Sequence, residues 1–220
     1  MATRMSPEPL WDLPLSARAP RPYVGAYELP NQPPGGSLNH GALPSIAYVL
    51  NGIVRWTTTS GTAIDVNTGE ARATPTEGFV ETNPGTTTSV WYAFVVYTLS
   101  SRSLLTNGVQ REIAASTMLP VPQPAGRYTL RLDMVTVEAG GRTAAVAHAG
   151  AAVVVVLEGE IELRQPQNKH DYLAPGKGLA VQPGGAMQVF DRGPATAKVL
   201  EFFYTPDSKP FETPLTTPLN

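Results

Sequence analysis

The chain has 220 residues, of which 42% are hydrophobic, and its 16 lysines and arginines nearly balance its 18 aspartates and glutamates. The resulting net charge of −2, without a run of basic residues, excludes the electrostatic footprint that nucleic-acid binding needs. The lack of cysteine excludes disulfides, thiolate metal ligands and a cysteine nucleophile.

Two features bear on localisation. The start of the chain, MATRMSPEPLWDLP, is interrupted by prolines and acidic residues where a secretory signal would be continuously apolar. The longest apolar run, at residues 149–157, is about half as long as a membrane-spanning helix. We therefore expect a soluble, cytoplasmic protein with no membrane partner.

The 22 prolines and 20 glycines are spread along the chain between short apolar segments, a pattern typical of many strands joined by turns. A short helix is expected at residues 109–118, after Asn107-Gly108. In chain order, we expect strands at residues 45–50, 52–58, 89–99, 128–137, 151–157, 160–164, 186–190 and 197–204. This pattern predicts an all-β protein with few short helices.

An internal repeat organises these strands. The first copy reads HGALPSIAYVLNGIVRW at 40–56 and GFVETNPGT at 78–86, and the second reads HAGAAVVVVLEGEIEL at 148–163 and PGKGLAVQPGG at 175–185. Each copy has a histidine, an apolar run, a tight turn, a second strand and then a Pro/Gly turn. The repeat predicts two domains of the same kind.

The segment LPVPQPAG at 119–126 marks the domain boundary, because its three prolines cannot sustain a helix or a sheet ladder. We expect an amino-terminal extension at 1–22, a first domain at 23–118, a linker at 119–126, a second domain at 127–204 and a Pro/Thr-rich tail at 205–220. We expect the tail to lie extended over the surface or over a partner, with a lid over a pocket as the alternative.

The repeats resemble the cupin superfamily, whose two motifs are usually written G-x5-H-x-H-x3,4-E-x6-G and G-x5-P-x-G-x2-H-x3-N. The second copy follows this spacing, with one extra residue in the second motif, through Gly140, Val146, His148, Ala152, Gly159, Gly176, Pro183, Gly185, Gln188 and Arg192. The first copy matches more loosely, through Gly35, Leu38, His40, Ser45, Gly52, Gly78, Pro84, Gly85 and Ser89. The resemblance covers residues 23–204 and implies a bicupin, two tandem antiparallel β-barrels of the jelly-roll type.

In metal-binding cupins, two histidines and a glutamate of the first motif and a histidine of the second hold one divalent metal. Those positions here carry Val146, His148, Ala152 and Gln188 in the second copy, and Leu38, His40, Ser45 and Ser89 in the first. Each barrel keeps one histidine, whereas a metal centre needs about three or four imidazole or carboxylate ligands. We expect no bound metal, and a divalent metal held by atypical ligands is the main alternative.

Among the three histidines, His148 is the first candidate for a site. It could act as a general acid or base, since the ordinary pKa of imidazole suits proton transfer near neutrality, with the Gln188 amide steadying an oxyanion. It could equally be a former metal ligand now satisfied by Gln188 or a backbone carbonyl. His40 faces the same alternatives, and His170, in a polar turn, is expected to be a solvated loop residue.

Side-chain alternation predicts the lining of the barrels. If Ser89 faces inward, Trp91, Ala93 and Val95 do so as well, and Tyr92 and Phe94 then face the contact between the barrels. The aromatic rings could wall a ligand cavity or, as we expect, fill the barrel. Residues 160 and 162, both glutamates, are expected to face solvent, and Arg131 and Asp133 to form a surface ion pair. The candidate pocket residues are His40, Trp56, Ser89, Trp91, Val146 and Ala152.

These observations favour a protein that binds or transforms a small organic molecule without a tightly bound metal. An isomerase, cyclase or lyase that works by histidine-assisted proton transfer would fit. Two alternatives stay open: a non-catalytic binding or structural bicupin, and a metal-dependent dioxygenase or isomerase. A homodimer of such chains is also open.

Overall fold

The structure is a computed structural model that describes residues 8–15, 23–98, 111–115 and 126–220. Within these ranges all regular elements are β-strands, every pairing between them is antiparallel, and none of the segments forms a helix that could cross a bilayer. The predicted linker lies outside these ranges except for Gly126. The all-β prediction is confirmed.

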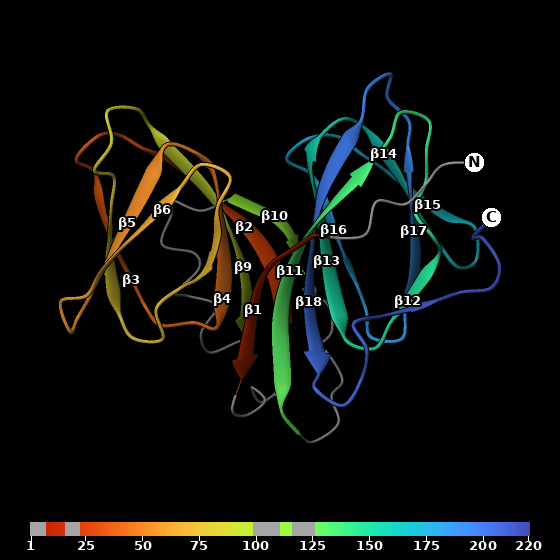
Figure 1. Cartoon of the computed structure of the whole chain (residues 1–220), viewed down its shortest axis with the longest axis horizontal. Coiled ribbons are helices and arrows are strands. Elements are labelled where there is room, and N and C mark those ends of the chain that lie inside the picture. The colour runs from red at the N-terminus through yellow and green to blue at the C-terminus, as the bar shows by residue number, and fades with distance from the viewer. Residues whose placement is uncertain (1–7, 16–22, 99–110, 116–125) are drawn as a thin grey trace.

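The first barrel combines a sheet of order β10-β2-β9-β4-β7 with a sheet of order β3-β8-β5-β6 (Figure 1). Its strands are β2 (Tyr23–Gln32), β3 (Ser37–His40), β4 (Ser45–Asn51), β5 (Ile53–Thr58), β6 (Ala63–Asn67), β7 (Ala71–Ala73), β8 (Phe79–Thr82), β9 (Ser89–Tyr97) and β10 (Arg111–Ala115).

The second barrel repeats this arrangement with sheets of order β1-β11-β18-β13-β16 and β15-β14-β17-β12-β19. Its strands are β1 (Glu8–Leu15), β11 (Tyr128–Val137), β12 (Val146–His148), β13 (Ala151–Glu158), β14 (Ile161–Gln165), β15 (Lys169–Leu173), β16 (Gly178–Val181), β17 (Ala186–Asp191), β18 (Ala197–Pro206) and β19 (Glu212–Pro214). Both ends of the chain therefore add a strand to this barrel, β1 beside β11 and β19 beside β12.

The helix expected at 109–118 is wrong where it can be checked. Residues 111–115 form β10, which pairs with β2 and places Arg111 opposite Glu28. Ala114 is buried against the other barrel, whereas Arg111 is exposed and ion-paired with Glu28. The β10 segment has one buried and one solvated face, and pairing with the edge strand β2 stabilises it as a strand. Local sequence does not reveal such a pairing.

The two barrels meet through one continuous hydrophobic core, which we call the junction core. It unites side chains of β2, β4 and β9 with side chains of β11, β13 and β18, and the labelled strands lie face to face in Figure 1. Tyr92 and Phe94 belong to this core, as predicted. Each barrel also has its own inner core, built from the opposite faces of the same strands.

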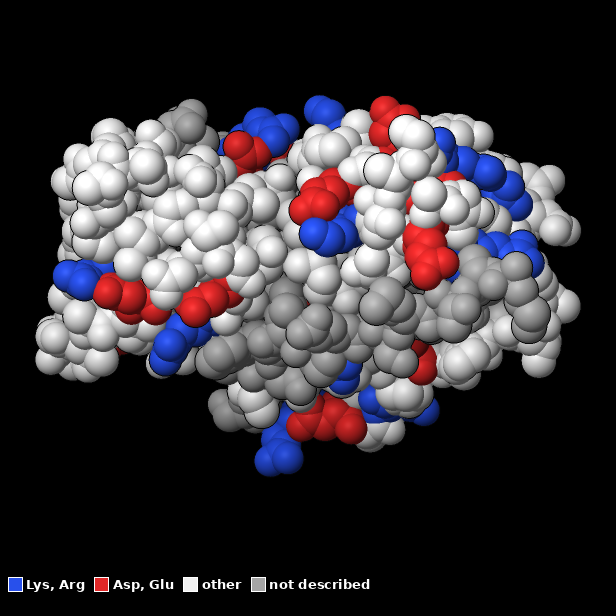
Figure 2. All heavy atoms as spheres, turned by 45° about the horizontal axis from the view of Figure 1, so that its top comes forward, with Lys and Arg blue, Asp and Glu red and all other residues white. Residues whose placement is uncertain are grey.

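The surface carries charges of both signs. On the face shown in Figure 2, basic and acidic side chains lie beside one another, and much of the surface over the first barrel is uncharged. No basic stripe of the kind that follows a phosphate backbone is visible on this face.

Candidate functional site

A histidine, a glutamate and a tryptophan are linked by hydrogen bonds at one end of the first barrel. In the β3–β8 pair, His40 lies opposite Phe79 and Leu38 opposite Glu81, so His40 and Glu81 are diagonal neighbours on one face. His40 Nε2 lies 2.7 Å from Glu81 Oε2, and Trp91 Nε1 donates to Glu81 Oε1 at 2.9 Å. The carboxylate is thereby fixed between an imidazole and an indole.

This arrangement assigns the imidazole tautomer. An ionised carboxylate only accepts hydrogen bonds, so with Glu81 in this form the His40 proton is assigned to Nε2, which donates to Glu81 Oε2. Nδ1 then carries the lone pair, and no hydrogen bond to it is found within the described chain. The side chain of His40 is 10% exposed and that of Glu81 is 3% exposed. The orientation of the His40 ring is therefore set by a buried acid, a geometry that catalytic His–acid pairs also have.

A small cavity adjoins His40. Its volume is about 30 Å³, and its lining includes Phe79, Trp91 and the pair Ser45 and Thr74, whose hydroxyls hydrogen-bond to each other at 2.5 Å. This is room for about one water molecule. Around it, Trp56 and Trp91 pack edge to face with ring centroids 6.0 Å apart. These buried rings pack in the interior of the first barrel, and the cavity beside His40 adjoins Trp91.

Three buried polar groups in this barrel lack a hydrogen-bond partner among the described residues: the Gln32 side-chain carbonyl, the Trp56 indole N–H and the Ser89 hydroxyl. Ser89 lies on β9 on the same face as Trp91, so it points inward, as predicted. Along β9, Ser89 comes two residues before Trp91, whereas Ala93 and Val95 come after it. Ala93 and Val95 line the cavity together with His40.

In the second barrel, His148 is buried under aromatic rings. It is 1% exposed, and its ring centroid lies 5.6 Å from that of Phe203, which in turn contacts Phe211 at 5.7 Å. Val146 and Ala152 are core residues of the barrel interior. They contribute packing and offer no polar group to a ligand.

Gln188 lies on the other face of its strand. Met187 and Val189 belong to the inner core, so alternation places Gln188 outside the barrel. Its amide donates to the Thr143 carbonyl at 2.7 Å and accepts from the Leu219 N–H at 3.0 Å. The expected shared pocket of His148 and Gln188 is therefore corrected: Gln188 instead holds the carboxyl-terminal tail.

The interior of the second barrel also contains carboxylates. Asp133 and Glu201 are opposite one another on β11 and β18, and each is 2% exposed. Arg131 pairs with Asp133 at 2.7 Å, so the predicted ion pair exists but is not a surface pair.

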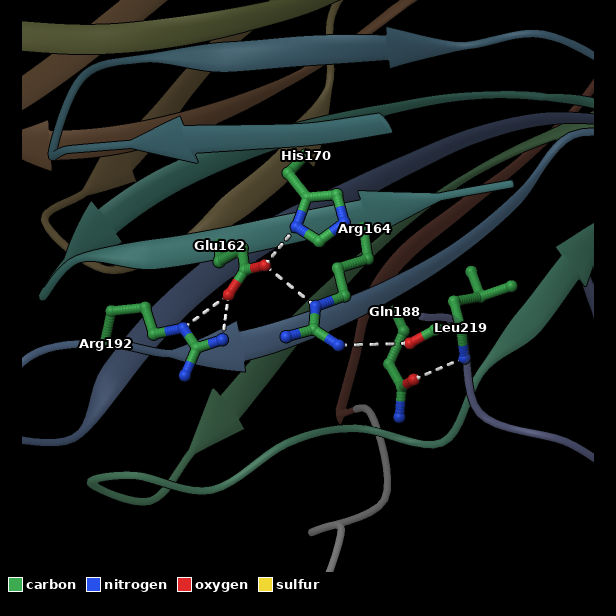
Figure 3. A network of polar contacts seen from close by, with 6 residues as sticks. All are labelled: Glu162, Arg164, His170, Gln188, Arg192 and Leu219. Carbon is green, nitrogen blue, oxygen red and sulfur yellow. Dashed lines mark hydrogen bonds and ion pairs between the residues drawn. The ribbon is translucent and has the colours of Figure 1, made fainter. Parts of the chain in front are cut away.

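A polar network on the outer face of the same barrel was not predicted (Figure 3). Glu162 is 1% exposed, and its carboxylate is contacted by Arg164 Nε at 2.8 Å, His170 Nδ1 at 2.6 Å and the Arg192 guanidinium. Burial would raise the pKa of Glu162, but hydrogen bonds from Arg164, Arg192 and His170 outweigh it and lower the pKa to about 2.

Two expectations are thereby corrected. Glu162 does not face solvent, because the neighbouring side chains on β15 and Arg192 cover it. His170 is not in a loop but on β15, opposite Arg164. The spacing of Glu162 and Arg164, two residues apart on one strand, was the available sequence signal for a pair on one face.

The residues present do not fit the metal of the cupin family. The described ranges contain no group of three His, Cys, Asp or Glu side chains that could hold a metal ion. In the second barrel, the apolar residues Val146 and Ala152 occupy positions that carry metal ligands in the family. In the first barrel, His40 and Glu81 bond to each other and are two possible metal donors. Two donors do not make a stable centre.

No protein-family model and no curated protein sequence matches the chain. Solved structures do match. Oxalate decarboxylase of Bacillus subtilis, studied for its Mn(II) centres, superposes with a TM-score of 0.61 at 12% identity, covering 99% of this chain and 79% of that one. A salicylate 1,2-dioxygenase variant from Pseudoaminobacter salicylatoxidans gives 0.53 at 14% identity, with coverage of 83% and 70%.

A cupin 2 conserved barrel domain protein from Leptotrichia buccalis matches with a TM-score of 0.50 at 14% identity, covering 91% of this chain and 92% of that one. At these identities the likeness shows the fold alone. Together with the repeated strand order of the two barrels, it confirms the resemblance found in the sequence. The chain has the fold of the cupin superfamily, present twice as a bicupin.

Proposed function

We propose that the protein binds a small organic molecule at the end of the first barrel and that His40 transfers a proton there without a resident metal. The observation that carries this proposal is the hydrogen-bonded sequence of His40, Glu81 and Trp91 beside a cavity. A base needs a free lone pair, a fixed orientation and a site for the reacting atom, and the Glu81 contact and the adjoining cavity support this role for His40.

The chemistry would be a proton shift. Nδ1 of His40 takes a proton from a carbon or hydroxyl of the ligand, and the Nε2–H bond to Glu81 stabilises the imidazolium that forms. Return of the proton to another atom of the ligand completes an isomerisation, and loss of a leaving group instead gives an elimination. Ser45 and Thr74 line the cavity, and their hydroxyls, which bond to each other, would orient the ligand by exchanging that bond for one to the ligand.

The small cavity limits how a ligand could bind. A volume of about 30 Å³ holds a hydroxyl, carbonyl or methyl group, so only the reacting end would enter the barrel. The remainder would lie outside, near the partly exposed segment 41–43. This favours small carbonyl compounds as the substrate class.

The test is proton exchange in D₂O, followed by ¹H NMR over a panel of small aldehydes, ketones and 2-oxoacids. We expect exchange at carbon next to the carbonyl with at least one compound, reduced at least 100-fold in His40→Gln. Glu81→Gln should reduce it as well, and His170→Gln, a histidine of the other barrel, should not. No exchange with any compound, or equal rates in His40→Gln, would overturn the proposal.

Elemental analysis of untagged protein purified without chelators tests the proposal that the protein holds no resident metal. Metal well below one equivalent per chain is expected from the donor sets. A stoichiometric metal would instead favour a metal-dependent enzyme with ligands other than those of the family motif.

A second candidate is the interior of the second barrel, because it buries His148 with Asp133 and Glu201. Phe203 packs against this histidine and Phe211 of the tail packs against Phe203, so we expect a ligand to reach His148 after the tail moves. Loss of exchange in His148→Gln but not in His40→Gln would select this barrel.

On sequence grounds we also propose a cytoplasmic location without nucleic-acid or membrane partners. A homodimer stays open, and light scattering after size-exclusion chromatography distinguishes it from a monomer.

A further inference from the structure

Three guanidinium groups surround one phenylalanine on the outer face of the second barrel. The Cζ atoms of Arg142, Arg164 and Arg192 lie 5.8, 4.1 and 5.3 Å from the ring centroid of Phe190. Arg142 forms a β-bridge with Phe190, Arg164 is on β14 and Arg192 directly follows β17. We call this group the arginine cluster. Cation–π contacts hold its positive charges close together.

Among the described residues, a single carboxylate, that of Glu162, forms ion pairs with the arginine cluster. Glu162 alone neutralises Arg164 and Arg192, and it also accepts from His170 (Figure 3). Arg142 makes no ion pair with any described residue. The nearby Asp191 carboxylate accepts from the backbone N–H groups of Gly193 and Ala197. Arg142 is therefore the guanidinium of the cluster without a carboxylate partner among the described residues, while Glu160 lines the cleft beside Arg192.

Parts of these guanidinium groups are still available to a ligand. Arg192 uses Nε and Nη2 on one oxygen of Glu162, which leaves Nη1, and its side chain is 43% exposed. Arg164 uses Nε on Glu162 and Nη1 on the Leu219 carbonyl, which leaves Nη2. Because Glu162 fixes both side chains, an anion would find these donors already oriented.

A cleft adjoins the cluster at Arg192. It has a volume of about 200 Å³ and is lined by Arg192 with Ile161, Tyr172, Leu173, Ala174 and Glu160. Tyr172 is 72% exposed, the one large hydrophobic side chain of the described residues that faces solvent so fully. An apolar body can lie against Tyr172 and Leu173 while its anionic end meets Arg192, in the orientation that turns this end from Glu160, which lines the same cleft.

We propose that the arginine cluster and this cleft form a binding site for a small organic carboxylate with an aromatic or other flat apolar body. A carboxylate fits the planar guanidinium edges, and the volume admits a ligand of roughly ten non-hydrogen atoms, well below ordinary drug-sized pockets. The site lies outside both barrels and does not depend on His40.

The test is isothermal titration of the full chain with benzoate, with benzamide as the uncharged isostere and inorganic phosphate as a non-carboxylate anion. We expect saturable 1:1 binding of benzoate with a dissociation constant of about 1 mM, weakened by salt. Arg142→Gln, which breaks no ion pair, should weaken it at least fivefold, and Arg192→Gln more. Arg55→Gln is the matched control, because Arg55 is also 43% exposed and ion-paired, with Asp65 in the first barrel.

Equal binding of benzamide would overturn the proposal by showing apolar association alone. Phosphate binding as tight as that of benzoate would overturn the choice of a carboxylate, and unaltered binding in Arg142→Gln would overturn the site. Because His40→Gln should leave benzoate binding unchanged, failure of the proton-transfer proposal and failure of this one are distinguishable.

Discussion

Phe94 of β9 and Phe202 of β18 stack across the junction of the two barrels, with ring centroids 5.6 Å apart and an interplanar angle of 30°. Both side chains are fully buried. They lie on equivalent strands, because β9 and β18 are the central strands of sheets with the same order. The duplicated sheets thus pack on each other much as two subunits of a dimer would.

Phe202→Ala should therefore destabilise the whole chain. Loss of a buried phenylalanine typically costs about 3–5 kcal/mol in the free energy of unfolding, since a cavity is left in a core that both barrels share. Urea unfolding followed by circular dichroism measures this cost, and Tyr172→Ala, at the solvated surface, should change it by less than about 0.5 kcal/mol. If the two variants were equally stable, the junction core would not couple the barrels.

The sequence was sufficient to predict this junction, because strict alternation along β9 separates Trp91 and Ala93 from Tyr92 and Phe94. The repeat likewise predicted two domains of one kind. The equivalent turns at Gly52 and Gly159 are part of this repeat, because both positions require glycine. Both glycines have positive φ, +78° and +77°, and an added Cβ would approach backbone atoms to about 3 Å. These constraints are local and can be read from the chain.

The candidate site was less predictable. Gln188 was assigned to the barrel interior by motif spacing that contains one extra residue. A shift of one residue in a strand moves every side chain to the other face, so this spacing alone could not decide which side chains of β17 point into the barrel. The structure shows that Met187 and Val189 point inward, which turns Gln188 outward.

Glu81 was missed for a different reason. It belongs to a segment read as a turn, and its role depends on β3 and β8 pairing across 41 residues of sequence to meet His40. Long-range pairing of this kind leaves no local signal.

Glu81→Gln should weaken the fold as well as the proposed activity. The glutamine keeps the size of the side chain but removes the charge that accepts from both His40 and Trp91, and hydrogen bonds to charged groups contribute about 1.5–3 kcal/mol. We expect a loss of free energy of unfolding near the lower end of that range. The matched control is Glu160→Gln, an exposed residue, which should leave stability unchanged.

The Glu162 network should make stability depend on acidity. Since the pKa of Glu162 falls from its ordinary value of 4.5 to about 2 on folding, its contribution is present above pH 4.5 and is lost as the pH falls towards 2. The difference between the two values sets an upper limit of about 3 kcal/mol. Glu162→Gln should be less stable than the parent at pH 7, and the gap should narrow progressively below pH 4.5.

Comparing the two proteins at each pH removes the effect of the other carboxylates, which titrate in both. Glu160→Gln should show no such converging gap. A gap between parent and Glu162→Gln that stays constant down to pH 2 would contradict the lowered pKa.

The carboxyl-terminal strand should control access to His148. Phe211, immediately before β19, packs on Phe203 and lies beneath the Arg131 guanidinium, whose Cζ is 5.0 Å from its ring centroid. β19 pairs with β12, where Glu212 lies opposite His148. Phe211→Ala should lower stability by about 1–3 kcal/mol, below the full value for a phenylalanine because the residue is only half-buried. It should also raise the rate at which diethyl pyrocarbonate modifies His148, followed by peptide mass spectrometry.

The control is Thr216→Ala, an exposed tail residue that should alter neither quantity. Removal of residues 210–220 separates the two roles that the tail could have. If His148 were modified faster and proton exchange that depends on His148 increased, the tail would act as a lid. Lowered stability with His148 still protected would mean that the tail only packs against the barrel, because Phe203 and the inner core would then be sufficient to shield the imidazole.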